Sequence, residues 1–230
     1  MGGVRPIAKL LSPDPLIADL AGETMIMARC KHGYFGGYPA GSLERMRQIL
    51  VAGDPDASIW HIPGGKAHKY NGAGGMPLSG YGPNDVRIDL DPETDPDICM
   101  DVRDLWRLLD GVDDTDEFTL IDREIVANKR IFQRPAGIII DRPYSKQMGD
   151  NYSPGGHALP NLTNLLRHCL VFVKPNGLVG VLDWTWPRTP KIRNSAGKLV
   201  AMARCVGVYP MTTGEGSQWR GFHVFQEIKR

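Results

Sequence analysis

The residues best placed to do chemistry are a carboxylate, a proline and a tyrosine close together in the chain, Asp141, Pro143 and Tyr144. They follow the run 137–140, whose consecutive isoleucines predict a strand buried on both faces, as in the middle of a parallel sheet. In open α/β sheets, ligands bind beyond the carboxyl ends of such strands. A carboxylate there can accept a hydrogen bond from an amino group, and a tyrosine on a stiff turn can stack on a flat ring. The alternative is an ordinary buried strand whose closing turn has no chemical role.

Strand and helix signals alternate along the chain on both sides of this turn, which predicts an α/β protein. Strands are predicted at 57–62, 85–91, 96–101, 137–140 and 178–184, and helices at 43–50, 105–109 and 162–170. Ser42 can cap the first helix, because a serine hydroxyl accepts hydrogen bonds from free backbone N–H groups. Two last strands, at 199–208 and 222–226, predict an antiparallel hairpin at the sheet edge.

The chain divides into an N-terminal arm, residues 1–37, and one domain, residues 38–230. The arm is predicted to be ordered but irregular, because prolines interrupt its short apolar groups. Within the domain, the Gly-rich stretch 66–84 lacks helical periodicity and predicts a long loop where a crossover helix is usual. An insertion at 110–135 is acidic first and basic afterwards, and its expected form is one solvated helix around 120–132.

The composition narrows the class of protein. A chain of 230 residues with a formal net charge of +1 fits one large α/β domain, in which any nucleic-acid contact must come from a local patch. No apolar run approaches the roughly 20 residues that span a bilayer, so no membrane partner is expected. The scattered cysteines and the absence of a secretory leader predict a reduced, cytoplasmic protein. Cys30 and His32 are too few to complete a zinc site, and we expect no metal.

The order of these elements resembles that of class I S-adenosylmethionine-dependent methyltransferases, over about 38–228. The stretch 141–145, Asp-Arg-Pro-Tyr-Ser, looks like the Asp-Pro-Pro-Tyr motif of amino-group DNA methyltransferases, which modify adenine N6 or cytosine N4. The stretch 173–178 is similar to the Pro-x-Gly turn before the fifth strand of many members, and 220–225 looks like their last strand. The resemblance implies a Rossmann-like class I methyltransferase fold, a mostly parallel central sheet with a C-terminal antiparallel hairpin. It also implies S-adenosyl-L-methionine as the cofactor.

This cofactor needs a close backbone approach for its amino-acid end, acceptors for its ribose hydroxyls and a polar group at its adenine edge. Glycines after the first strand permit the approach, an acid at the next strand tip suits the ribose, and a third acid suits the adenine amine. The predicted cofactor-binding residues are Tyr38, Pro63, Gly64, Gly65, Asp89, Asp91 and Asp101. Asp91 follows its strand more directly than Asp89, and both stay open for the ribose. The alternative role of each acid is a solvated turn or a helix cap. The glycine turn departs from the family in lacking the usual G-x-G spacing.

Methyl transfer to a neutral amine builds positive charge on the nitrogen, which gives the Asp141 carboxylate its proposed catalytic role. Tyr144 would stack on a base flipped out of a duplex. Arg142 is a candidate anchor for a phosphate or the cofactor carboxylate, or else a salt-bridge partner of a nearby acid. The predicted substrate-binding residues mix basic and aromatic side chains: Arg142, Lys66, Lys69, Tyr152, Trp184 and Trp186. Exposed loops of this composition also occur for solubility alone.

The leading hypothesis is therefore an enzyme that transfers a methyl group to an exocyclic amino group of a DNA base. One alternative is an RNA or small-molecule methyltransferase on the same fold, which agrees with the absence of a separate target-recognition domain. Another is a catalytically inactive, methyltransferase-like binding subunit, which agrees with the unusual glycine turn. The expected partner is nucleic acid, with DNA foremost, and the balanced charge is compatible with a homodimer or a larger complex.

Overall fold

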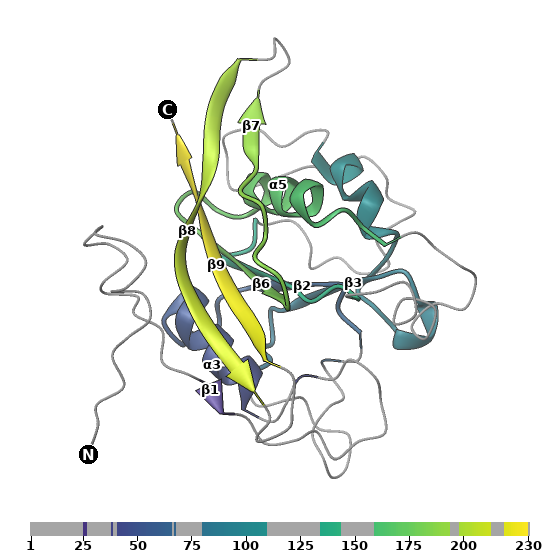
Figure 1. The fold of residues 1–230 in the computed structure, drawn as a ribbon. Helices are drawn as coiled ribbons and strands as arrows, with labels where there is room; N and C mark the ends of the chain where they lie inside the picture. The colour runs from purple at the N-terminus through teal and green to yellow at the C-terminus, as the bar shows by residue number, and fades with distance from the viewer. Residues whose placement is uncertain are drawn as a thin grey trace, which may run out of the picture.

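The computed structural model describes residues 25–26, 38, 41–65, 67, 80–109, 134–143, 159–193, 198–212 and 219–229. Within these ranges the strands form one mixed sheet (Figure 1). They are β1 (Met25–Ile26), β2 (Ile59–Ile62), β3 (Val86–Asp89), β4 (Ile98–Cys99), β5 (Gly137–Ile140), β6 (Leu178–Asp183), β7 (Lys191–Arg193), β8 (Leu199–Thr212) and β9 (Arg220–Lys229). The described helices are α3 (Ser42–Val51) and α5 (Leu162–Phe172), and the 3-10 helices are η2 (Pro92–Thr94) and η3 (Val102–Leu109).

The strand order is β4-β3-β2-β5-β6-β9-β8-β1, with β7 paired to β8 away from this path. The neighbours from β4 to β6 are all parallel. Strand β9 is antiparallel to both β6 and β8, and β1 is parallel to β8. The prediction of an α/β protein with a mostly parallel sheet and a C-terminal antiparallel hairpin is confirmed.

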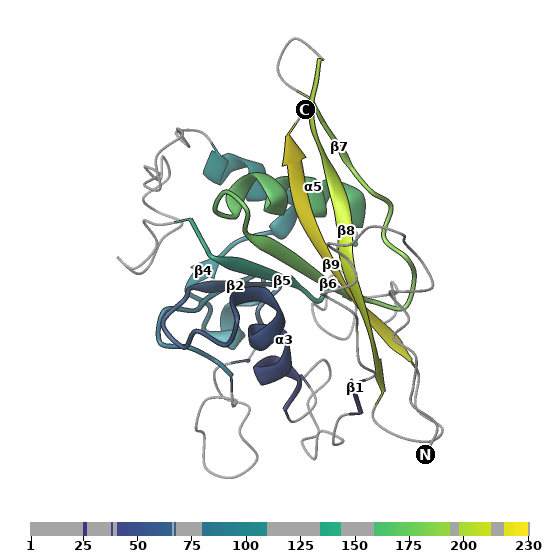
Figure 2. The same ribbon diagram turned by 90° about the vertical axis from the view of Figure 1, so that its left-hand side faces the viewer.

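The sheet is covered on both faces (Figure 2). Helix α3 lies on one face, and α5 and η3 lie on the other. The isoleucines of β5 alternate between the two cores, because successive side chains of a strand point to opposite faces. Ile138 and Ile140 pack with α5, and Ile139 packs with α3. All three are fully buried, so the prediction of a strand buried on both faces is confirmed.

Helix α5 begins at its predicted residue and ends two residues later than predicted, and the start of α3 corrects the prediction of its cap. Helix α5 begins after Asn161, whose side chain accepts a hydrogen bond from the backbone N–H of Asn164 at 3.1 Å. The prediction that Ser42 caps the first helix is wrong. Gly41 is the cap, with a left-handed φ of 79°, and Ser42 is already the first helical residue, completely buried. Glycine adopts that φ without a Cβ clash, which leaves the serine free to enter the helix.

Several other predictions differ from the structure in extent. Strands β3 and β4 are shorter than expected, and the predicted helix at 105–109 is a 3-10 helix that starts earlier, at Val102. The hairpin strands β8 and β9 are longer than expected, and β1 and β7 were not predicted. Most of the predicted loop 66–84 and the predicted helix 120–132 lie outside the described residues, as does most of the arm 1–37. No helix in the described ranges is long and apolar enough to cross a membrane.

Candidate functional site

The order of strands reverses between β2 and β5. From β2 the chain adds β3 and β4 on one side, whereas β5 and β6 lie on the other side. Ile62 of β2 is in register with Ile140 of β5, and the backbone N–H of Asp141 donates to the Ile62 carbonyl at 3.2 Å. Ligands bind outside the carboxyl ends of strands at such a reversal. The turns 63–65 and 141–143 are therefore neighbours at the place where the topology favours a site.

The glycine turn after β2 packs tightly on β3. The N–H of Gly64 donates to the Ile88 carbonyl at 2.9 Å, and a Cβ on Gly64 would lie 2.5 Å from the Cβ of Arg87. Gly65 has a left-handed φ of 48°, and a Cβ there would meet no atom of the described residues within 4 Å. The Gly65 N–H donates to Asp89 Oδ2 at 2.7 Å. Gly64 is thus needed for packing, and Gly65 leaves open space at the edge of the sheet.

Replacing Gly64 with alanine should move this turn away from β3. The nearest atoms to the new Cβ include the Arg87 backbone, which cannot give way as a flexible side-chain tip would. We expect a loss of about 1–3 kcal/mol in the free energy of unfolding, the range for overpacked sites. Urea denaturation measures this loss, and a variant as stable as the wild type would contradict the tight packing of the turn.

The three acids predicted for the cofactor lie along the same carboxyl edge, and each takes part in a local turn. Asp89 accepts hydrogen bonds from the backbone of Gly65 and Asp91. Burial raises the pKa of Asp89 and the charge of Asp91 adds to this, although those backbone hydrogen bonds partly offset it. Asp91 caps η2 by accepting from the Glu93 N–H at 2.9 Å. Asp91 therefore has the alternative role considered for it, that of a helix cap.

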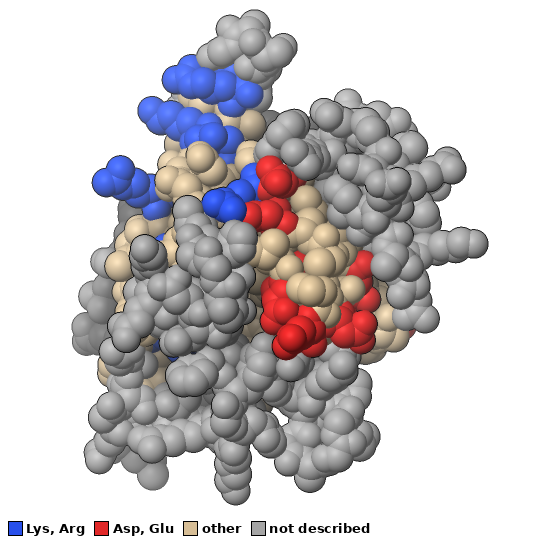
Figure 3. Space-filling view, turned by 90° about the vertical axis from the view of Figure 1, so that its right-hand side faces the viewer, with Lys and Arg blue, Asp and Glu red and all other residues tan. Residues whose placement is uncertain are grey.

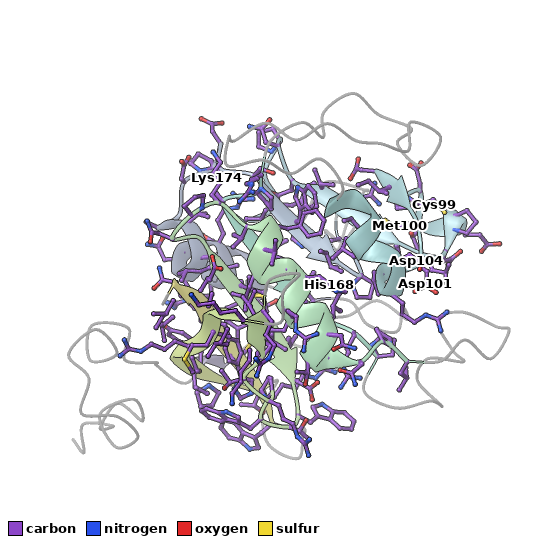
Figure 4. All side chains as sticks on the ribbon, turned by 90° about the horizontal axis from the view of Figure 1, so that it is seen from above. Cys99, Met100, Asp101, Asp104, His168 and Lys174 are labelled. Carbon is purple, nitrogen blue, oxygen red and sulfur yellow. The ribbon has the colours of Figure 1, made fainter. Side chains whose placement is uncertain are left out.

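Asp101 lies further out on this edge, at the start of η3. Its carboxylate accepts hydrogen bonds from both the backbone and the guanidinium of Arg103. Figure 4 shows Asp101 and Asp104 together with Cys99 and Met100 at the end of the molecule formed by β4 and η3. The backbone N–H of Met100 donates to the Asp89 carbonyl at 2.9 Å, which ties this end to the tip of β3.

The turn after β5 is held by an ion pair to the next strand. Arg142 Nη2 lies 3.2 Å from Asp183 Oδ2, and Arg142 Nη1 donates to the Pro143 carbonyl at 3.2 Å. Asp183, at the end of β6, is 2% exposed and also accepts from the N–H and hydroxyl of Thr185. Of the roles proposed for Arg142, the structure shows the salt bridge. This pair fixes the backbone that follows Asp141, whose side chain is half-buried.

Polar side chains lie beneath these turns, on the α3 face of the sheet. Tyr38 is 4% exposed, and its hydroxyl has no hydrogen-bond partner within the described residues. Burial raises the pKa of Tyr38 well above its usual value, and the charges of Asp141 and Asp85 raise it further. The Tyr38 ring is edge-on to the ring of His61, with centroids 6.1 Å apart. The buried His61 Nδ1 likewise lacks a partner in the described ranges. The Tyr38 hydroxyl is therefore a buried polar group close enough to Asp141 to be affected by its charge.

A buried carboxylate, Asp85, connects this cluster to the scaffold. Both its oxygens lie 2.5 Å from Arg47 Nη2, and Oδ2 lies 3.2 Å from His61 Nε2. It also accepts from the backbone N–H groups of Ile59 and Gly82 at 2.9 Å. Burial alone would raise the pKa of Asp85, but the hydrogen bonds and charges of His61 and Arg47 outweigh it and lower the pKa. This carboxylate therefore joins α3 to the starts of β2 and β3.

Exposed tryptophans follow β6 and precede β9. Trp184 is 42% exposed, Trp186 is 55% exposed and Trp219 is 60% exposed. They share one end of the sheet, because Asp183 of β6 pairs with Gly221 of β9. The Trp186 ring is held edge-on against His223, with centroids 5.0 Å apart. The predicted substrate residues Trp184 and Trp186 are thus exposed beside the Arg142–Asp183 pair.

Protonation of His223 should destabilise the protein. Burial lowers the pKa of His223 to about 4, although the charge of Asp183 partly offsets this. The unfolded chain binds this proton near pH 6.5 and the folded chain does not, so stability falls as the pH drops from about 6.5 towards 4. The wild type should lose about 2 kcal/mol between pH 7.5 and pH 5 from this group. Urea denaturation at both pH values should show a smaller loss in His223→Phe, and equal losses would contradict the assignment.

Four predicted site residues, Tyr144, Lys66, Lys69 and Tyr152, lie outside the described residues. Six residues of the site and its support were not predicted from the sequence: His61, Arg47, Asp85, Asp183, Trp219 and His223. A signal for Arg47 exists, because it stands among Leu43, Met46 and Leu50 on the apolar face of α3. Asp85 directly precedes the buried strand β3, which is an unusual place for an acid unless a partner is near.

Comparison of the chain with protein-family models and with curated proteins finds no match. Within the described residues, no group of three histidine, cysteine or acidic side chains is arranged to hold a metal ion.

Proposed function

We propose that this protein is an S-adenosyl-L-methionine-dependent methyltransferase that acts on an exocyclic amino group of a DNA base, adenine N6 or cytosine N4. One observation carries the proposal. The glycine turn after β2 and the Asp141 turn after β5 are joined by the hydrogen bond from Asp141 N–H to the Ile62 carbonyl, at the reversal of strand order. The backbones of a turn suited to a cofactor and of a turn that carries a carboxylate are thus about one strand spacing apart, near 4.8 Å.

The arrangement of strands supports the Rossmann-like class I methyltransferase fold that the resemblance implies. Parallel strands extend to both sides of β2, and the antiparallel β9 lies between β6 and β8. The sheet is sandwiched between α3 and the pair α5 and η3. These features agree with the predicted order of elements, from the glycine turn to the final hairpin.

The residues of the site fit this cofactor. The open space at Gly65 admits a close backbone approach, and Asp89 stands at the tip of the neighbouring strand as an acceptor. The buried Tyr38 hydroxyl, which lacks a partner among the described residues, would be satisfied by a polar group of the cofactor. Gly65, Asp89 and Tyr38 would therefore hold it, with Asp91 and Asp101 further along the same edge. When bound, the cofactor supplies an electrophilic methyl group.

The chain's own contribution to transfer is orientation and charge stabilisation. A carboxylate at Asp141 accepts a hydrogen bond from the target amino group, which directs the nitrogen lone pair. The nitrogen gains positive charge during transfer, and the negative charge of Asp141 favours that change. The Arg142–Asp183 pair holds the turn in place, so the carboxylate needs little reorganisation. Tyr144 would stack on the target base.

We propose a cytoplasmic setting and a nucleic-acid partner. Cys99, Cys169 and Cys205 are free thiols, which supports a reducing compartment. Exposed aromatic and basic residues near β6 support a nucleic-acid substrate, although the net charge of the chain is only +1. A homodimer or a larger complex remains compatible with that charge balance.

The deciding experiment is transfer of an isotope-labelled methyl group to a mixture of unmodified DNA, RNA and free nucleosides. Mass analysis of the digested nucleosides then identifies the product. We expect labelled N6-methyladenine or N4-methylcytosine from the DNA. Label in RNA or free nucleosides alone would replace DNA as the substrate, and no label from a folded protein would favour a binding subunit.

A further inference from the structure

The segment 184–193, from the end of β6 to the end of β7, is mostly exposed and is interrupted by three buried side chains. Its buried residues are Pro187, Pro190 and Ile192. Its exposed residues include two tryptophans and three cations, which we call the aromatic-basic track: Trp184, Trp186, Arg188, Lys191 and Arg193. The inward prolines and isoleucine anchor the segment, so its aromatic and basic groups are displayed in sequence on the surface.

The charge around this track is of one sign. Residues 184–214 contain five basic residues and no acidic one, whereas residues 85–104 contain eight acidic residues and two basic ones. Strands β8 and β4, which belong to these two stretches, lie on opposite sides of the centre of the sheet. Figure 3 shows the basic side chains gathered on one projection and the acidic ones elsewhere on the same face. The net charge of +1 therefore conceals a strongly basic region.

The aromatic end of the track lies beside the proposed catalytic turn. Trp184 follows Asp183, which holds Arg142, and the pairing of Asp183 with Gly221 brings Trp219 to the same end. His223 supports the Trp186 ring from the side. From there the chain leads through Arg188 to Lys191 and Arg193 at β7, away from the catalytic turn (Figure 1). The tryptophans of the track therefore lie near the proposed catalytic turn, and its three basic residues lie further from that turn.

We propose that the aromatic-basic track binds single-stranded nucleic acid, with bases stacked on Trp184 and Trp186 and phosphates bound by Arg188, Lys191 and Arg193. This inference rests on the proposed function in taking nucleic acid as the substrate. Bases of a duplex are stacked on one another, so their faces cannot stack on exposed tryptophans, whereas the faces of unpaired bases can. An acidic peptide would match the cations but would not supply a regular series of flat rings.

The test measures binding of fluorescein-labelled single-stranded DNA of about 16 nucleotides, a length within the range of known sites. Fluorescence anisotropy is recorded over a series of salt concentrations, without cofactor. In Arg188→Gln/Lys191→Gln/Arg193→Gln, the slope of log K against log salt should fall by about 2, since each phosphate contact contributes about 0.7. Trp184→Ala and Trp186→Ala should each weaken binding by about tenfold. Arg45→Gln, an exposed cation on α3, is the matched control and should bind as the wild type does.

The outcomes separate the track from the proposed chemistry. An unchanged slope in the triple variant, or equal binding of a duplex of the same sequence, would overturn the track, whether or not methyl transfer occurs. If track variants weaken binding but the wild type transfers no methyl group, the track stands and the proposed reaction fails. Because every substituted residue is exposed, circular dichroism should show unchanged folding in all variants.

Discussion

Replacing Asp141 with alanine is expected to lower the rate of methyl transfer by about 100- to 1000-fold, the usual effect of losing one preorganised electrostatic group. The carboxylate stands at the carboxyl end of β5 beside the glycine turn, on the edge where the strand order reverses. In the proposed reaction this carboxylate orients the amino group and offsets its growing positive charge, and alanine can do neither. Steady-state transfer of labelled methyl groups measures the rate.

Cofactor binding should survive this substitution, because the proposed cofactor residues lie at Tyr38 and at the ends of β2, β3 and β4, and none lies on the turn after β5. Isothermal titration with S-adenosylmethionine checks this expectation. Asp56→Ala is a suitable control, since Asp56 is an exposed acid before β2 and should leave both measurements unchanged. Full activity in Asp141→Ala would remove the turn from the mechanism.

The second large effect is expected in stability. Asp85→Asn keeps the shape of the side chain but removes the charge opposite Arg47, which is 4% exposed. An uncompensated buried charge typically costs about 3–5 kcal/mol. Arg47 also donates to the carbonyls of Gly80, Asp54 and Ala57, so it cannot turn towards water without breaking those bonds. Urea denaturation of the variant should show this loss, and Asp56→Asn should show none.

The Asp85 carboxylate should also affect how the free energy of unfolding depends on pH at acidic pH. The pKa of Asp85 is lower in the folded chain than its unfolded value of about 3.9. Its contribution is therefore complete above that pH and disappears as the pH falls through the folded value. In Asp85→Asn, the free energy of unfolding should no longer decrease from protonation of this side chain at low pH. Parallel curves for the variant and the wild type below about pH 4 would contradict the assignment.

Sequence patterns predicted those elements whose burial and turns are determined by neighbouring residues in the chain. The isoleucines of β5 and the turn at 174–177 before β6 are of this kind, and helix α5 begins at its predicted residue, Leu162. The carboxyl edge could be predicted as well, since parallel strands place their ends together. Asp91, Asp101 and Asp141 follow three such strands, and Asp89 is the last residue of the first of them.

The parts that could not be predicted depend on contacts between distant residues. The Arg47–Asp85 pair joins positions 38 residues apart, and Arg142–Asp183 joins positions 41 apart. Strand β7 has three residues with exposed ends, so its strand state comes from pairing with β8 rather than from its own pattern. Ser42 is a local prediction that was wrong. Serine is a favourable helix cap, but the glycine one residue earlier, Gly41, is the cap of α3.

The position of β9 has a consequence for synthesis of the chain. This strand comes last among those described, yet it lies between β6 and β8. Until β9 is synthesised, no strand connects β6 with β8. The edge of each that will later pair with β9 is then open to pairing with other chains. At about 5–20 residues per second, β9 follows β8 from the ribosome within a few seconds. The nascent protein therefore passes through a brief stage in which the two parts of the sheet are not yet connected by β9. Slow translation after Thr212 would lengthen this stage and increase the risk of aggregation.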